Sequence, residues 1–299
     1  MTVWEERMSI PDLAIAKYQQ GQNFRYFKLT VDKIKQPILS DITIDAYGFN
    51  QSTPGPLLVI KHGEWLFLEV ENNLDEPTAV HVHGIPKPNS QDGAPDIEPT
   101  PKINPGESYT YKFQALRTGT FFYHSTMGFQ ANLGLLGPLV VLPQDGYIDP
   151  TSIPSHDYVQ IIQQWQIDQP DTGKVYPGTY KPDKFCNNPN FFTLNGKSFP
   201  YTTPMYTSYG EKVRIRFLNK TNGNHTMHIH GHNFQIAEID GFPRDRLYDD
   251  TIIIGSGKRY DIEFIANNPG VWPVNGTRMF HKSNNGVTPG GMVTRLKYR

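Results

Sequence analysis

An internal repeat is the feature that most limits how this chain can fold. Six residues of the first half recur in the second half at a constant offset of 147 positions. The first copy contains Gly63, Glu64, Asn72, His81, His83 and Gly84, and the second contains Gly210, Glu211, Asn219, His228, His230 and Gly231. Matches at one fixed offset predict two copies of one domain, because a duplicated domain keeps the spacing of its structural residues.

The repeat continues toward the end of each copy at an offset of 151 positions. The matching residues are Gly106, Tyr109, Phe113, Gly119 and Phe121 in the first copy and Gly257, Tyr260, Phe264, Gly270 and Trp272 in the second. This register places Asn275 opposite His124 and Thr277 opposite Thr126. The two copies therefore differ in their histidine content at the end of the repeat.

Each copy has the composition of short strands joined by turns. Runs such as SYTYKF and KVRIRFLN are rich in β-branched and aromatic residues, which favour strands. The 26 glycines and 25 prolines suit many turns. We therefore predict an all-β protein of two tandem β-sandwich domains.

The domain boundaries follow from the same patterns. Residues 1–23 are predicted to form an N-terminal arm, and residues 24–145 the first domain. A polar stretch with two prolines indicates a linker over residues 146–158. Residues 159–299 then form the second domain.

Charge and composition argue against several classes of partner. The formal net charge of −1 predicts neither nucleic-acid binding nor membrane-surface binding. No apolar run approaches the roughly 20 residues needed to cross a bilayer. The single cysteine, Cys186, excludes an intrachain disulfide framework and a cysteine-based zinc site. No signal peptide is visible, so a cytoplasmic location is expected by default, and an extracytoplasmic one if a leader was removed.

Histidines gather in the second copy. The sequence NHTMHIHGHNF contains four of the ten histidines of the chain. On a strand, side chains alternate between faces, so His228, His230 and His232 are predicted to share one face, with His225 free to point elsewhere.

The first copy has His81 and His83 at the matching positions, and His124 follows the aromatic run GTFFY. Neutral imidazole suits copper, zinc, iron or nickel. One His-x-His pair is weak evidence for a metal, but the same pair in both copies predicts a metal site. His124 fits either a ligand or a buried core histidine. Asp92, shortly after the first pair, fits either an acid or second-layer partner of the site or a turn residue before glycine.

Three segments carry a resemblance to a known family. They are TPGPLLVIKHGEWLFLEVENNLDEPTAVHVHGI, GTFFYHSTMGFQANLGLLGPLVV and HTMHIHGHNF. From about residue 40 to the end, the chain resembles the multicopper oxidases, specifically the two-domain, laccase-like members. The resemblance implies two tandem cupredoxin-like Greek-key β-sandwich domains, copper as cofactor, and oxidation of a small molecule by oxygen. It also implies a homotrimer, with copper held between domain 1 of one subunit and domain 2 of the next.

The resemblance assigns metal roles to particular histidines. By the family pattern, His81 and His228 would hold the type 2 copper. His83 and His124 would hold one copper of the type 3 pair, and His230 would hold the other. His225 would be a ligand of the type 1 copper, through which electrons enter.

The sequence departs from the family pattern at the remaining ligands. In the first domain, Thr126 stands where a second type 3 histidine is expected. In the second domain, Asn275 and Thr277 replace two type 3 histidines, and Gly276 replaces the type 1 cysteine.

On this gapless alignment His281 becomes the second type 1 histidine, and Met292 its axial partner. A shifted alignment makes His281 a type 3 ligand instead. The gapless version is preferred because the internal repeat also pairs Asn275 with His124.

Loss of the cysteine has a direct chemical consequence. A blue copper site needs a thiolate beside two imidazoles, so no blue type 1 copper is expected here. The leading hypothesis is a copper-dependent oxidase that works at a reduced, interdomain histidine site. The alternatives are a protein that sequesters or delivers copper without turnover, and a degenerate domain pair whose histidines are relics.

Overall fold

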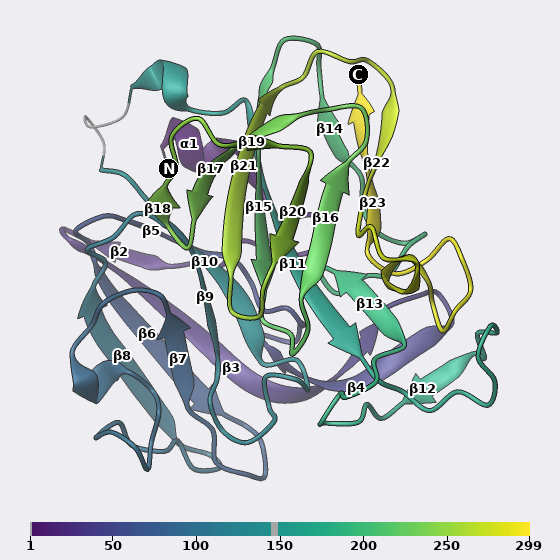
Figure 1. Cartoon of the computed structure of the whole chain (residues 1–299). Helices are drawn as coiled ribbons and strands as arrows, with labels where there is room; N and C mark the ends of the chain where they lie inside the picture. The colour runs from purple at the N-terminus through teal and green to yellow at the C-terminus, as the bar shows by residue number, and fades with distance from the viewer. Residues whose placement is uncertain (1, 145–148) are drawn as a thin grey trace. The chain divides into compact units, whose positions relative to one another are not determined.

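The computed structural model describes residues 2–144 and 149–299, and it confirms an all-β chain with only short helices (Figure 1). By its internal contacts the chain divides into two compact units. The first unit comprises residues 13–34 and 46–144, and the second comprises residues 2–12, 35–45 and 149–299. None of the helices in the described residues has the length and apolar character needed to span a membrane.

The first unit is built from two sheets. A four-stranded sheet has the order β5-β10-β9-β7, and the second sheet contains β2, β6, β8, most of β3 and residues 46–49 of β4. Residues 35–37 of β3 and 42–45 of β4 belong to the second unit, where β4 pairs with β12. The strands are β2 (Gln19–Gly21), β3 (Phe24–Pro37), β4 (Ile42–Phe49), β5 (Leu58–Lys61), β6 (Trp65–Asn72), β7 (Val80–His83), β8 (Ser108–Gln114), β9 (Gly119–Ser125) and β10 (Leu136–Leu142), with the 3-10 helix η1 (Asn89–Gln91). Alternate residues of β3 and β6 are buried, as expected for strands with one face on a core. Both sheets supply residues to one apolar core, so this unit is a β-sandwich.

The second unit also packs two sheets around one core. An eight-stranded sheet runs β1-β11-β15-β21-β17-β18, with β13 on β11 and β19 on β17, and a five-stranded sheet runs β14-β23-β22-β16-β20. The strands are β1 (Met8–Ser9), β11 (His156–Trp165), β12 (Gly178–Tyr180), β13 (Phe191–Leu194), β14 (Met205–Thr207), β15 (Lys212–Asn219), β16 (His225–Ile229), β17 (Phe234–Ile239), β18 (Phe242–Pro243), β19 (Tyr248–Asp249), β20 (Thr251–Ile254), β21 (Arg259–Ile265), β22 (Val271–Asn275) and β23 (Val293–Tyr298). The helices are α1 (Val3–Arg7), η2 (Pro150–Ser152) and η3 (Met279–Lys282).

The strand register reproduces the sequence repeat. His81 on β7 lies opposite His124 on β9, and His228 on β16 lies opposite Asn275 on β22. The residues that the two offsets match between the copies therefore occupy equivalent cross-strand positions in the two units. The first partner of the pair is histidine in both units, His81 and His228. The second partner is His124 in the first unit and Asn275 in the second.

An asparagine conserved between the copies closes the same loop in each unit. The side-chain amide of Asn72 donates to the carbonyls of Glu76 and Ile103. In the second unit, the amide of Asn219 donates to the carbonyls of Gly223 and Ile254. Each buried amide joins two main-chain carbonyls from different segments of its unit, which explains why the repeat retains asparagine here.

The segments flanking the two units were predicted as an arm and a linker. Residues 3–7 form α1, and β1 pairs with β11 inside the second unit. Residues 146–148 of the predicted linker lie outside the described residues, and residues 156–158 begin β11. The domain boundaries themselves stay a prediction.

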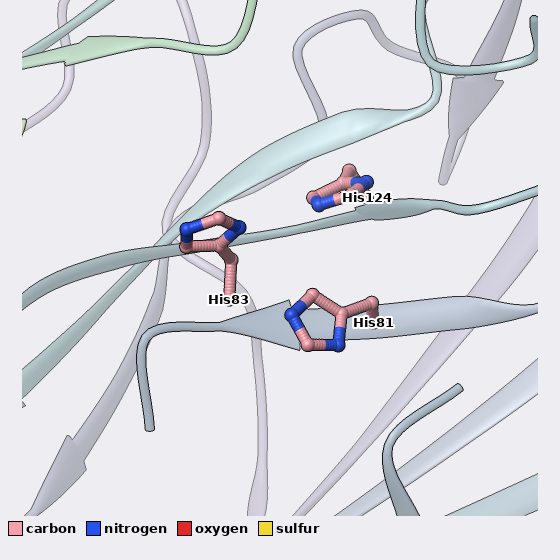
Figure 2. Close-up of side chains that lie close together, drawn as sticks. All are labelled: His81, His83 and His124. Atoms are coloured by element: carbon pink, nitrogen blue, oxygen red, sulfur yellow. The ribbon is translucent and has the colours of Figure 1, made fainter. Parts of the chain in front are cut away.

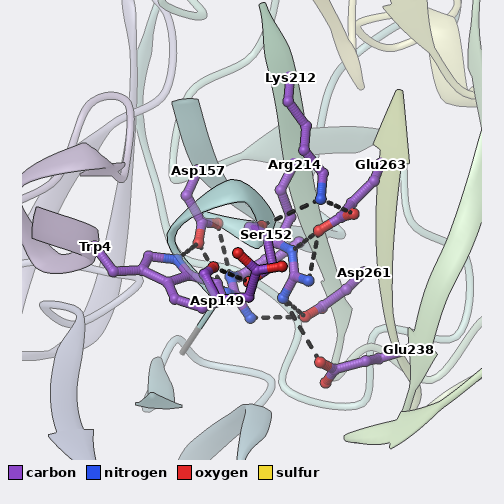
Figure 3. A network of polar contacts seen from close by, with 10 residues as sticks. Trp4, Asp149, Ser152, Asp157, Lys212, Arg214, Glu238, Asp261 and Glu263 are labelled. Atoms are coloured by element: carbon purple, nitrogen blue, oxygen red, sulfur yellow. Dashed lines mark hydrogen bonds and ion pairs between the residues drawn. The ribbon is translucent and has the colours of Figure 1, made fainter. Parts of the chain in front are cut away.

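A buried ion-pair network ties the N-terminal residues to the second unit (Figure 3). Arg216 on β15 is fully buried, and its guanidinium donates to Asp157 at 2.7 Å and to Asp261 at 2.6 Å. Burial opposes its charge, but the two carboxylates outweigh that effect and raise the pKa of Arg216. The Trp4 indole of α1 donates to the same Asp157 at 2.7 Å. A buried cation needs such partners, so the network fixes α1 against this sheet.

Candidate metal centre

Three histidines of the first unit form a potential metal site (Figure 2). His81 and His83 come from β7, and His124 comes from the neighbouring strand β9. One ring nitrogen from each lies within 4.8 Å of the others. In the described residues, this is the one group of three or more such side chains close enough to share an ion. The structure therefore brings together the three first-domain histidines that the sequence singled out.

Backbone carbonyls orient two of these rings. The Nδ1 atom of His81 lies 2.7 Å from the carbonyl oxygen of Asp92, and that of His124 lies 2.9 Å from the carbonyl oxygen of Ser125. A ring that donates through Nδ1 keeps its Nε2 lone pair for a metal, which is the usual arrangement of a metal-binding histidine. His83 is held differently, because its ring stacks on Phe122 with centroids 4.6 Å apart.

Asp92 acts here chiefly through its main chain. It follows η1, its side chain is 38% exposed, and its carboxylate lies 3.2 Å from the Lys87 ammonium. The next residue, Gly93, has φ +79°, and a Cβ there would lie 2.0 Å from the carbonyl oxygen of Val80. Only glycine allows this loop to approach β7 closely enough for the Asp92 carbonyl to reach His81.

Thr126 stands at one of the positions where the family pattern has a histidine. Its hydroxyl donates to the carbonyl of Gly93 at 2.5 Å. The side chain thus helps to hold the loop that orients His81. The missing ligand has been replaced by a residue with a structural hydrogen bond.

The second unit has a smaller set of imidazoles at the matching place. His228 and His230 lie close together, with ring centroids 4.8 Å apart. The Nδ1 atom of His228 lies 2.7 Å from the carbonyl oxygen of Asp250, as His81 does with Asp92. The Nε2 atom of His230 lies 3.1 Å from the side-chain oxygen of Asn275. An amide therefore contacts a ring where the first unit has a third imidazole.

A second pair of histidines lies inside the same unit. The Nδ1 atoms of His225 and His281 are 3.5 Å apart, and both side chains are buried. Burial lowers the pKa of His225 to about 3, with smaller contributions from His281 and Arg278. Burial also lowers the pKa of His281 to about 4, with Arg278 adding to the effect. Both rings are therefore neutral near pH 7, which is the form that binds metals.

Gly276 lies between this pair and Met292. A Cβ built on Gly276 would lie 3.1 Å from the terminal methyl of Met292 and 3.3 Å from the Cβ of His281. This position corresponds to the cysteine of the family pattern on the gapless alignment. His225, His281 and Met292 thus surround a place that holds no sulfur ligand other than the thioether.

The prediction that His232 shares a face with His228 and His230 was wrong. Strand β16 ends at Ile229, and Gly231 has φ +71°, which turns the chain. His232 is therefore buried, with its Nε2 atom 2.6 Å from the Tyr298 hydroxyl. His232 thus serves as a hydrogen-bond partner for the Tyr298 hydroxyl at the edge of the core.

Cys186 lies in the second unit and is held as a thiol. It is buried, and burial raises its pKa to about 11. Its sulfur lies 3.6 Å from the carbonyl oxygen of Gln164.

One residue of the site could not be found from the sequence. Asp250 supplies the carbonyl that orients His228, but it does not lie at the repeat offset from Asp92, because the intervening loops differ in length. No local pattern in the sequence marks a residue whose main-chain carbonyl orients a histidine.

Comparison with known proteins identifies the class to which this fold and site belong. The sequence matches two domain families described as multicopper oxidase, over residues 30–146 and residues 168–289. The chain therefore belongs to the multicopper oxidase family. This confirms cupredoxin-like sandwich domains as the fold class and copper as the metal that the family binds.

Individual relatives agree with this assignment. The chain is 28% identical to Multicopper oxidase MmcO of Mycobacterium tuberculosis over 268 residues, which cover 80% of this chain and 50% of that protein. The crystal structure of Blue Copper Oxidase from Nitrosomonas europaea is similar with TM-score 0.80 and 30% identity, covering 91% of this chain and 85% of that one. Multicopper Oxidase mgLAC is similar with TM-score 0.79 and 30% identity, covering 91% and 86%. The chain spans about half, or less, of the length of the curated relatives it matches.

The residues present suit copper in one unit better than in the other. In the first unit, three imidazole nitrogens converge and two are oriented by carbonyls, which is a suitable donor set for copper. In the second unit, His228 and His230 offer two imidazoles, and the thiolate of a blue site is absent.

Proposed function

We propose that this protein is a copper-binding oxidoreductase of the two-domain multicopper oxidase type, which oxidises a small molecule with oxygen. The observation that carries the proposal is the convergence of the His81, His83 and His124 nitrogens within 4.8 Å. Bound copper would supply the electron and oxygen chemistry, as in other copper enzymes. The protein's own contribution is to hold the imidazoles in place and to keep them oriented.

In this proposal Asp92 is a positioning residue. Its carbonyl accepts from His81 Nδ1, so His81 presents its other nitrogen to the metal. Asp250 does the same for His228 in the second unit. Such outer hydrogen bonds raise the basicity of a metal-binding imidazole and fix its tautomer.

The proposed copper site is shared between the two kinds of unit. The first unit has three suitable histidines and the second has His228 and His230, so each carries only part of a ligand set. Sharing one site between the first unit of one subunit and the second unit of the next leads us to propose a homotrimer. Sedimentation should show a trimer that His81→Ala and His228→Ala weaken in the presence of copper, and a stable monomer would contradict this arrangement.

The proposed enzyme has no blue type 1 copper. Gly276 offers no thiolate, and a blue centre requires one beside two imidazoles. Electrons from the substrate would therefore reach the histidine site without the usual relay. Copper-loaded wild-type protein should lack the intense blue charge-transfer band.

The central test measures copper content and oxygen uptake together. From the imidazoles available, we expect roughly one to two coppers per chain. Oxygen uptake with a phenolic reductant should exceed that of free copper at the same concentration. Both signals should fall in His81→Ala and His228→Ala, but not in the matched controls His62→Ala and His156→Ala, which remove histidines outside the group.

Absence of the blue-site cysteine also favours a second candidate, a protein that sequesters or delivers copper without turnover. The same experiment separates the two functions. Copper binding that depends on His81 and His228, without oxygen uptake above free copper, would establish the carrier. Protein that binds zinc alone, or no metal, would exclude both functions.

A further inference from the structure

The second unit has a pocket of about 520 Å³ next to His230. This volume lies in the range of small-molecule sites. Most of its walls are apolar, and they include Phe199, Val271, Pro273, Met279, Pro289 and Val293. His230, a metal ligand in the family pattern, lines only one edge of this pocket. Metal binding therefore does not account for the other walls.

The floor of the pocket is one face of the five-stranded sheet. Pro273 on β22 lies opposite Arg295 on β23, and the amide of His230 donates to the Pro273 carbonyl at 3.0 Å. Three neighbouring chain segments thus place His230, Pro273 and Arg295 in a row. With strands about 4.8 Å apart, the row extends roughly 10 Å from His230 to Arg295. Residues on the opposite face, such as Val274 and Leu296, are buried in the core.

Two cations line this pocket without an acidic partner. Arg295 and Lys282 have no ion pair with any residue in 2–144 or 149–299. The Nε atom of Arg295 is buried and has no hydrogen-bond partner in that part of the chain. The guanidinium lies over the Phe199 ring, 5.6 Å from its centroid. An N–H buried in this way is costly unless a ligand accepts from it.

We propose that the pocket binds an aromatic monocarboxylate, with the carboxylate at Arg295 and Lys282 and the ring against the apolar wall. A carboxylate matches the paired donors of a guanidinium. The apolar wall formed by Phe199, Pro273 and Val271 suits a ring and disfavours a fully hydrated inorganic anion. The far end of the ligand lies toward His230. That the bound acid is also the reductant of the enzyme rests on the proposed function.

Binding to metal-free protein tests the pocket by itself. In calorimetry, 4-hydroxybenzoate should bind saturably, and the neutral analogue 4-hydroxybenzyl alcohol should bind at least about tenfold more weakly, because it leaves both cations without a partner. Arg295→Met and Lys282→Met should each weaken 4-hydroxybenzoate binding about tenfold or more. Lys297→Met, which removes the same charge from the same strand outside the pocket, should bind as wild type does.

Several outcomes would overturn the inference. They are no saturable binding of 4-hydroxybenzoate, equal binding of the neutral analogue, or an equal loss in Lys297→Met. Inorganic phosphate that competes as well as 4-hydroxybenzoate would show an anion site without the apolar half. Lys282 lies on η3 rather than in a sheet, so Lys282→Met keeps the test decisive if Arg295→Met fails to fold.

A separate measurement tests whether the bound acid is also the reductant of the enzyme. With copper-loaded protein, Arg295→Met should raise the KM for 4-hydroxybenzoate about tenfold more than the KM for 4-hydroxybenzyl alcohol, whereas Lys297→Met should leave both KM values unchanged. If 4-hydroxybenzoate binds to metal-free protein and no reductant supports oxygen uptake, the proposed function is wrong and the proposed binding pocket is confirmed. If oxygen uptake is found without binding of 4-hydroxybenzoate, the proposed binding pocket is wrong and the proposed oxidase function is confirmed.

Discussion

At three equivalent positions, the first unit has a hydrogen-bonded polar cluster and the second has two histidines and a glycine. The hydroxyls of Thr78 and Ser125 donate to the Gln130 side-chain oxygen at 2.8 and 2.7 Å. At the repeat offsets of 147 and 151, the second unit has His225, Gly276 and His281. The same fold therefore holds a polar cluster with internal hydrogen bonds in the first unit. In the second unit it holds a pair of neutral imidazoles that can bind a metal.

The comparison shows that a change of residues at these three positions separates a potential metal site from a polar cluster. In both units the positions are buried and come from matching strands and loops. In the first unit, the Gln130 amide completes its bonding at the Pro77 carbonyl, at 3.0 Å. In the second, the Nε2 atom of His225 is satisfied by the Thr221 hydroxyl at 2.7 Å, and its other nitrogen faces His281. The second arrangement lacks one sulfur ligand to become a blue copper site.

Supplying that sulfur is the strongest way to sharpen the comparison. Gly276→Cys places a thiol beside His225, His281 and Met292, and after copper loading it should produce an intense blue absorption that the wild type lacks. Room for the new Cβ requires neighbours to shift by a few tenths of an ångström. Optical and paramagnetic resonance spectra would measure the outcome.

Ser125→Cys is the matched control for this variant. It introduces the same thiol at the equivalent position of the first unit, where Thr78 and Gln130 replace the two imidazoles. It should give no blue band. A band in both variants, or in neither, would show that the two positions do not differ in the way described.

The outer faces of the larger sheets differ as well. Arg216 lies opposite Asp261 in the second unit, and the repeat places Glu69 opposite Thr110 at the same point of the first. Arg216 is fully buried, whereas the Glu69 side chain is 23% exposed and lies near Lys28, with a hydrogen bond from the Tyr26 hydroxyl. Arg216→Met should lower the free energy of unfolding by about 3–5 kcal/mol, because it removes the buried cation that two buried carboxylates share.

The equivalent substitution in the first unit should have a much smaller effect. Glu69→Met removes a partly exposed ion pair and the hydrogen bond from Tyr26, and should cost about 1 kcal/mol. Denaturant titration of the two variants measures the difference. Similar losses would mean that burial does not distinguish the two faces.

Exchanging the residues of the His124 and Asn275 pair tests the metal site itself. His124→Asn reproduces the second-unit arrangement in the first unit, and copper affinity should fall by about 100-fold, since one of three imidazole ligands is lost. Asn275→His should raise copper affinity of the second unit. Competition with a chelator measures both changes, and an unchanged affinity in His124→Asn would exclude His124 as a ligand.

The two buried histidines should make metal-free protein sensitive to acid. Their pKa values are lowered to about 3 and about 4, against roughly 6.5 in an unfolded chain. Between about pH 6.5 and pH 4, the unfolded chain binds protons that the folded chain does not. The free energy of unfolding should therefore fall with pH, by ~1.4 kcal/mol per pH unit for each imidazole.

Copying the first unit should remove this sensitivity. The double variant His225→Thr, His281→Gln introduces the residues found at Thr78 and Gln130, which do not titrate. Its stability should depend less steeply on pH over the same window, as measured by denaturant titration of metal-free protein. Parallel pH profiles would contradict neutral burial of the pair, and His62→Gln controls for loss of a histidine elsewhere.

Much of the fold and site could be predicted from the sequence because duplication leaves fixed spacings. The offsets matched His81 to His228 and His124 to Asn275, and the strand register gives the matched residues equivalent places in the two units. The prediction failed at His232, since alternation assumed a strand that ends at Ile229. The positive φ of Gly231 changes which way the next side chain points, and periodicity cannot report such a turn.

The sequence by itself determined the repeat, the strand-rich class, the imidazoles available for copper and the missing cysteine, because each depends on residue type and spacing along one chain. Only the tertiary structure decided which groups meet across strands and loops. It revealed the carbonyls of Asp92 and Asp250 behind the histidines, and the pocket that joins Arg295 to Lys282. The physical reason is that backbone groups are alike in every sequence, so their role at a site arises only when folding brings them within hydrogen-bond distance of a side chain.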